Sequence, residues 1–126
     1  MKILVVDDDI NQIRLIRERY SRIAGNRVFE AINGEEGMEV ALVEKPDIIL
    51  LDVMMPVMNG WELCKYLRNK RDFDHTGIIM LTAIGPNLNE MTSPLYGADD
   101  FVDKPFLFAE LDEKIEKVLQ KRSPKA

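Results

Sequence analysis

The sequence contains almost no cysteine or histidine. Cys64 is the one cysteine in 126 residues, so no intrachain disulfide can form, which is compatible with a reducing compartment. Its apolar neighbours predict that Cys64 fills space in a helix. His75, the one histidine, stands in the polar stretch RDFDHTG, and we expect a surface loop there rather than a metal ligand or a general base.

Long apolar runs and an excess of basic residues are also absent. No run approaches the length that spans a bilayer, and no secretory signal pattern appears, so we expect a cytoplasmic protein without a membrane partner. The chain has 17 Lys and Arg against 22 Asp and Glu, which gives a formal net charge of −5. Because a nucleic-acid interface needs a basic face, we expect no direct nucleic-acid binding by this domain.

What the sequence does contain is an alternation of short apolar runs with longer amphipathic stretches, which is typical of β–α units in a single domain. The predicted strands are 2–6, 27–31, 47–51, 77–81 and 100–102. Three of them, KILVV, DIILL and GIIML, are too continuously apolar to have a wet face. Such strands belong in a parallel sheet that helices cover on both faces.

Polar residues follow four of these strands at the point where each ends. They are Asp7, Asp8 and Asp9 after the first strand, Asp52 after the third, Thr82 after the fourth and Lys104 after the fifth. Ligands of open parallel sheets bind at the carboxyl ends of the strands. If the first, third, fourth and fifth strands are neighbours, these side chains meet on one edge.

Several carboxylates in one pocket repel each other, and a hard divalent cation relieves that repulsion. Mg²⁺ takes oxygen ligands and keeps several waters, so one or two carboxylates suffice. The acidic run therefore predicts half of a metal site that Asp52 completes. Asp9 is instead expected to cap a helix, since Gln12 follows three residues later.

A metal beside a carboxylate, a hydroxyl and an ammonium resembles phosphoryl-transfer machinery. An aspartate can act as a covalent nucleophile and form an acyl phosphate. Mg²⁺ and a lysine neutralise the transferring group, while a hydroxyl donates to its oxygens. Asp52, Thr82 and Lys104 supply one group of each kind.

With these residues placed, the chain resembles the receiver domain of bacterial and archaeal two-component response regulators. The matching stretches are ILVVDDD, IILLDVMMPVMNGWEL, MLTA and GADDFVDKPF. The resemblance covers residues 1–121 and leaves 122–126 as a basic tail or the start of a linker. It implies a flavodoxin-like (βα)5 fold, a doubly wound α/β structure with strand order 2-1-3-4-5 and helices on both faces.

The resemblance also implies a role for each site residue. Asp52 accepts a phosphoryl group from a histidine kinase or phosphotransfer protein, and Thr82 and Lys104 contact that group. Mg²⁺ is held by Asp8, by Asp52 and by the backbone carbonyl of Met54, with Asp7 acting through a bound water. Phe101 stands at the position of the switch aromatic that responds to Thr82, and the Lys104–Pro105 bond is cis. The family is not a class of enzymes that act on a separate substrate.

The output of such a domain is the face formed by its fourth helix, fifth strand and fifth helix, which acts on a partner or a further domain. Residues 85–97, where the fourth helix belongs, include Pro94, so we expect a short or broken helix that ends near Thr92, with above-average mobility. In the DNA-binding subfamily this face dimerises through basic residues of that helix. Residues 85–97 contain no Lys or Arg, so we expect no phosphorylation-dependent dimer of that kind, or one with different contacts.

Two other interpretations use the same residues. A phosphatase of the haloacid dehalogenase type also has an Asp nucleophile and Mg²⁺, but it needs a second Asp where this chain has Met54. A receiver-like interaction module without chemistry usually lacks part of the acidic set or the lysine, and this chain keeps both. A dinucleotide-binding fold is disfavoured because no G-x-G-x-x-G follows the first strand.

Overall fold

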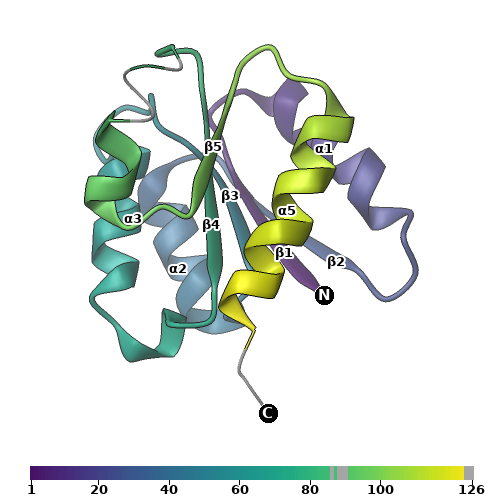
Figure 1. Cartoon of the computed structure of the whole chain (residues 1–126), viewed down its shortest axis with the longest axis horizontal. Helices are drawn as coiled ribbons and strands as arrows, with labels where there is room; N and C mark the ends of the chain where they lie inside the picture. The colour runs from purple at the N-terminus through teal and green to yellow at the C-terminus, as the bar shows by residue number, and fades with distance from the viewer. Residues whose placement is uncertain (86, 88–90, 124–126) are drawn as a thin grey trace.

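Five parallel strands form one sheet in the order β2-β1-β3-β4-β5 in the computed structural model, which describes residues 1–85, 87 and 91–123 (Figure 1). The strands are β1 (Lys2–Val6), β2 (Arg27–Ala31), β3 (Ile48–Asp52), β4 (Gly77–Thr82) and β5 (Asp100–Asp103). The helices are α1 (Ile10–Ser21), α2 (Gly34–Glu44), α3 (Gly60–Arg68) and α5 (Phe108–Arg122), with short 3-10 helices η1 (Arg71–Phe73) and η2 (Ser93–Tyr96). The predicted strand order is confirmed, and the bounds of β1 and β2 match the prediction. Strands β3, β4 and β5 end one residue later than predicted, so Asp52 and Thr82 are the last residues of their strands.

Helices cover both faces of the sheet, as the continuous apolar strands predict. In Figure 1, α2 and α3 lie on one side of the sheet and α1 and α5 on the other. Alternate strand residues point to opposite faces, so β1 sends Leu4 and Val6 into the α2–α3 core and Ile3 and Val5 into the α1–α5 core. Cys64 is buried in the first of these cores, where it acts as a small apolar side chain.

Side-chain caps start three of the helices, and the cap predicted at Asp9 is one of them. The Asp9 carboxylate accepts hydrogen bonds from the backbone N–H groups of Asn11 and Gln12. Asn33 caps α2, and Asn59 forms a complete capping box with Glu62 at the start of α3. These caps satisfy N–H groups that have no partner within the helix, and so they fix where each loop at the carboxyl edge ends.

The segment after β4 is interrupted where proline predicts it. Thr92 precedes η2, and Pro94 occupies the first turn of that 3-10 helix, where its missing N–H costs little. The remaining part of the expected helix includes residues 86 and 88–90, which lie outside the described residues. The expected mobility of this segment stays a prediction.

The C-terminal helix extends slightly beyond the expected domain end. Helix α5 ends at Arg122, one residue past the boundary predicted at 121, while residues 124–126 lie outside the described part of the chain. Within the described residues, no helix has the length and apolar character that crossing a membrane requires.

Gly77, the first residue of β4, provides a test of how closely α5 packs on the sheet. A Cβ atom there would lie 2.5 Å from a Val118 methyl and 2.6 Å from the Ile48 Cδ1 atom. Overpacking of this kind costs about 1–3 kcal/mol. We therefore expect Gly77→Ala to lower the free energy of unfolding by that amount in urea denaturation. A variant as stable as the parent contradicts the observed packing of Val118 over β4.

Candidate functional site

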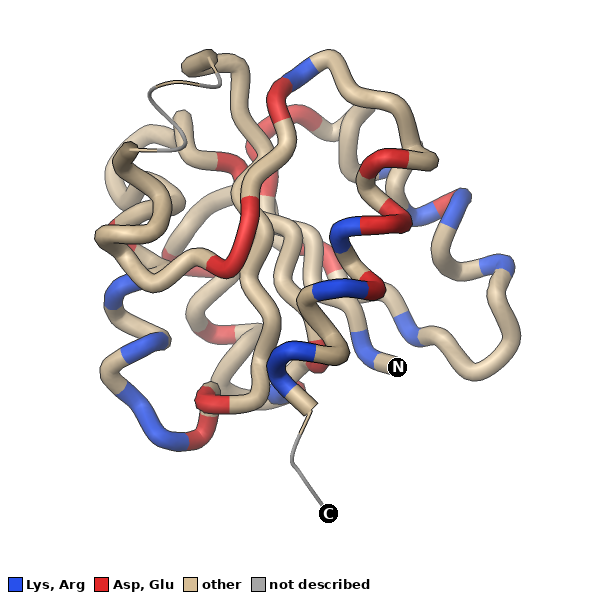
Figure 2. The backbone as a smooth tube through the Cα atoms, in the orientation of Figure 1, with Lys and Arg blue, Asp and Glu red and all other residues tan. Residues whose placement is uncertain are grey.

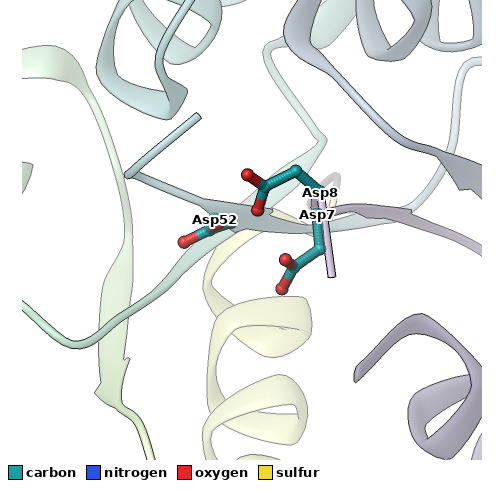
Figure 3. Close-up of side chains that lie close together, drawn as sticks. All are labelled: Asp7, Asp8 and Asp52. Carbon is teal, nitrogen blue, oxygen red and sulfur yellow. The ribbon is translucent and has the colours of Figure 1, made fainter. Parts of the chain in front are cut away.

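Three carboxylates meet at the carboxyl edge of the sheet. Asp7 and Asp8 follow β1, and Asp52 is the last residue of β3 (Figure 3). Each offers an oxygen, and these three oxygens lie within 4.8 Å of one another. Asp7 and Asp52 are buried, whereas Asp8 is exposed. Strands β1 and β3 are direct neighbours, and this pairing brings the carboxylates together from positions 44 or more residues apart.

Lys104 lies between the two buried carboxylates. Its Nζ atom is 2.7 Å from Asp7 Oδ2 and 3.7 Å from Asp52 Oδ1. The residue is placed by the loop after β5, and its backbone N–H donates to the Thr82 carbonyl of β4. The Lys104–Pro105 peptide bond is cis, the isomer that the resemblance implies. Asp7 is therefore paired directly, while Asp52 keeps a weaker contact with the ammonium group.

Thr82 ends β4 beside this group, and its hydroxyl is buried without a hydrogen-bond partner in the described part of the structure. A buried hydroxyl normally has a partner, because its desolvation otherwise costs free energy. A polar group that bound at this edge of the sheet would give the Thr82 hydroxyl the partner it lacks.

Burial and charge repulsion make Asp52 hard to ionise. Burial, followed by repulsion from Asp7, raises the pKa of Asp52 to about 7, although Lys104 opposes the change. Residues that are arranged with strongly shifted pKa values often mark functional sites. A cation bound here would remove the repulsion and leave Asp52 as a carboxylate.

The loop after β3 holds features that sequence reasoning missed. Val57 has φ +70°, and Met58 N–H donates to the Pro56 carbonyl at 2.8 Å, which closes a three-residue turn. A β-branched residue rarely adopts this left-handed conformation. Gly60 then starts α3 so close to Asp52 that a Cβ atom would overlap the Asp52 carbonyl oxygen. The Asn59–Gly60 pair in MNGW was the sequence signal of this close approach.

Of two further predicted site residues, Met54 contacts the cluster and Phe101 lies farther down the sheet, in β5. Met54 N–H lies 3.4 Å from Asp52 Oδ1, and its side chain is 63% exposed. The role of its carbonyl as a ligand stays a prediction. Phe101 is half-buried in β5 opposite Met80, two residues behind Thr82 in the register, with the Lys114 ammonium over its ring.

Comparison with known proteins identifies this arrangement. The family model of the response regulator receiver domain matches residues 3–116. This chain belongs to that family. The receiver fold is also seen in the chemotaxis protein CheY4 of Vibrio cholerae, with a TM-score of 0.85 and 32% sequence identity over 94% of this chain and 98% of that one.

Curated relatives of this receiver domain are named as transcriptional regulators. The probable transcriptional regulator ycf27 of Pyropia yezoensis is 45% identical over 95% of this chain and 48% of its own length. The alkaline phosphatase synthesis transcriptional regulatory protein PhoP of Bacillus subtilis is 38% identical over 95% of this chain and 49% of its own length. The chain thus spans about half the length of the curated relatives it matches.

The raised pKa of Asp52 gives the receiver domain a defined pH dependence without metal. The folded state holds a proton on Asp52 up to pH of about 7, whereas the unfolded chain releases it near 4, so stability falls as pH rises between these values. In chelator-treated buffer we expect Asp52→Asn to exceed the parent in unfolding free energy by roughly 1–3 kcal/mol at neutral pH, with a smaller gain at acid pH. Urea titrations across this range measure it, and a gain that does not change with pH contradicts the raised pKa.

Proposed function

We propose that this receiver domain accepts a phosphoryl group onto Asp52 in a Mg²⁺-dependent reaction with a histidine kinase or phosphotransfer protein. The observation that carries the proposal is that the Asp7–Asp8–Asp52 cluster with Lys104, and the unpartnered Thr82 hydroxyl, stand at the same carboxyl edge of the sheet. Each of these groups meets one requirement of phosphoryl transfer to a carboxylate.

The residues present fit a hard divalent cation. Carboxylate oxygens are the ligands that Mg²⁺ prefers, and it retains waters, so Asp8 and Asp52 with Asp7 behind them are a sufficient donor set. Bound there, the cation would neutralise charge on the carboxylates and on the transferring group. The buried and lysine-paired state of Asp7 supports an indirect role, while the exposed Asp8 is open to a cation from solvent.

The chain's own residues then divide the chemistry among them. An Asp52 oxygen attacks phosphorus, the bond from phosphorus to the donor breaks, and the donor leaves with that electron pair. Lys104, already 3.7 Å from Asp52, is near enough to balance negative charge on the incoming group. The Thr82 hydroxyl donates a hydrogen bond to a phosphoryl oxygen, and that bond gives the hydroxyl the partner it otherwise lacks.

Signalling rather than turnover of a separate substrate follows from this proposal. Phosphorylation draws the Thr82 side chain towards the phosphoryl group. Phe101 is half-buried and lies two residues before the residue that pairs with Thr82 in the sheet, and it then moves inward to fill the space that Thr82 leaves. The face formed by η2, β5 and α5 then acts on an output partner or domain. The phosphatase alternative lacks its general acid, since position 54 carries an exposed methionine.

Phosphorylation by a small donor tests the proposal directly. With Mg²⁺ and acetyl phosphate, we expect the parent to gain the mass of one phosphoryl group, and Asp52→Asn to gain none. Asp9→Asn is the matched control, because Asp9 only caps α1 and asparagine also caps well. A parent that gains no mass contradicts the proposal.

Asp8→Ala should bind Mg²⁺ more weakly in fluorescence titrations of Trp61, and unchanged binding contradicts the ligand assignment.

The lifetime of the phosphorylated state depends on residues beside the pocket. Met54 and Ile84 are apolar, so neither can orient a water molecule for attack on the acyl phosphate. We expect slow loss of the phosphoryl group, and roughly tenfold faster loss in Met54→Asn, which is less than the ~10²–10⁴ of a fully positioned general base. Radiolabel decay measures the rate, with Met54→Leu as the control. Unchanged or slower decay in Met54→Asn contradicts the expectation.

A further inference from the structure

The start of helix α3 contacts Asp52, the proposed phosphoacceptor. The same helix also contacts the segment that contains η2 and β5. We call residues 93–103, from Ser93 to Asp103, the η2–β5 segment. Figure 1 shows α3 beside this segment on one side of the sheet. The contacts between them lie at both ends of α3 and involve different chemistry at each end.

The start of α3 rests on the backbone of Asp52. Gly60 N–H donates to the Val53 carbonyl at 3.0 Å, and the Gly60 Cα faces the Asp52 carbonyl with no room for a Cβ atom. Close-packed contacts transmit small displacements rather than absorb them. A shift of the Asp52 backbone on gaining a bulky dianionic group would therefore displace the first turn of α3.

The next residue in α3 holds η2. The Trp61 indole ring stacks on Tyr96 with ring centroids 5.7 Å apart and an angle of 12° between the planes. Its Nε1–H donates to the Ser93 hydroxyl at 3.4 Å, and Ser93 is buried. Stacked aromatic pairs have a preferred geometry, so η2 tends to follow Trp61 when that ring moves.

The end of α3 holds the turn between η2 and β5. The Arg68 guanidinium donates to the Gly97 carbonyl at 2.8 Å and to Asp99 at 2.7 Å, and its side chain is only 13% exposed. The Asp99 side chain is fully buried and also accepts from Ile78 N–H of β4 and from Arg122 of α5. In Figure 2, basic positions (blue) lie along α3 and acidic positions (red) lie at the start of β5. Breaking a buried ion pair is costly, so this end stays joined.

We propose that α3 transmits the phosphorylation state of Asp52 to the η2–β5 segment as a rigid body, with Trp61 and Arg68 as the positioning residues. This rests on the proposed phosphorylation of Asp52. A helix whose ends are both anchored moves as a unit, because its hydrogen-bond ladder resists internal change. This route starts at the Asp52 backbone and reaches η2 without passing through Thr82 or Phe101.

Hydrogen exchange before and after phosphorylation tests the proposal. In the parent, treated with Mg²⁺ and acetyl phosphate, we expect amide exchange in peptides covering 93–103 to change on phosphorylation. In Trp61→Leu that phosphorylation-dependent change should fall about twofold or more, while the mass gain at Asp52 stays as in the parent. Trp61→Phe, which keeps an aromatic ring for Tyr96, should restore most of the change.

The matched control is Tyr66→Leu, which removes an exposed aromatic ring from the same helix, where Tyr66 contacts Lys70. It should keep the full phosphorylation-dependent change. Equal loss in Tyr66→Leu and Trp61→Leu, or a full change in Trp61→Leu, overturns the assignment of Trp61. A parent that gains no phosphoryl mass contradicts the proposed function itself, and the same mass measurement separates the two failures.

Discussion

The burial of two neighbouring carboxylates is the constraint on which the candidate site depends. Asp7 follows β1 and Asp52 ends the neighbouring strand β3; burial, together with repulsion from Asp7, raises the pKa of Asp52 to about 7. Lys104 partly balances this cost by pairing with Asp7 at 2.7 Å. A cation bound beside these carboxylates would remove the remaining repulsion, and a bound group that accepts from the Thr82 hydroxyl would complete its hydrogen bonding.

The free-energy cost of this site is offset by the two apolar cores that pack on the faces of the sheet. The cores are built by the alternating faces of β1, β3 and β4, while the polar residues are confined to the carboxyl edge. The same edge holds the turn at Val57, which has a positive φ, and Gly60, which packs directly against the Asp52 carbonyl. Strain and charge are thus concentrated at one place, which is where a receiver domain undergoes its chemical change.

Much of the fold and the core of the site could be predicted from the sequence, because both rest on local patterns. Apolar runs predicted the strands, and Asp9 marked the start of a helix through its capping chemistry. The contacts of Trp61 with Tyr96 could not be predicted, since they join residues 35 positions apart through a segment whose helical periodicity proline interrupts. The buried ion pair of Arg68 and Asp99 was also missed, because both residues stand in polar stretches of the sequence that resemble surface segments.

By itself, the sequence determined which residue types stand at the end of each strand, and hence that carboxylates, a hydroxyl and an ammonium belong to one edge of a parallel sheet. Only the tertiary structure decided which of these groups pair with each other. Lys104 lies closer to Asp7 than to Asp52, and the Thr82 hydroxyl is left without a partner. Sequence order fixes which side chains reach the edge, but distances of a few ångströms depend on strand register, loop geometry and burial, which arise only when all five strands are assembled.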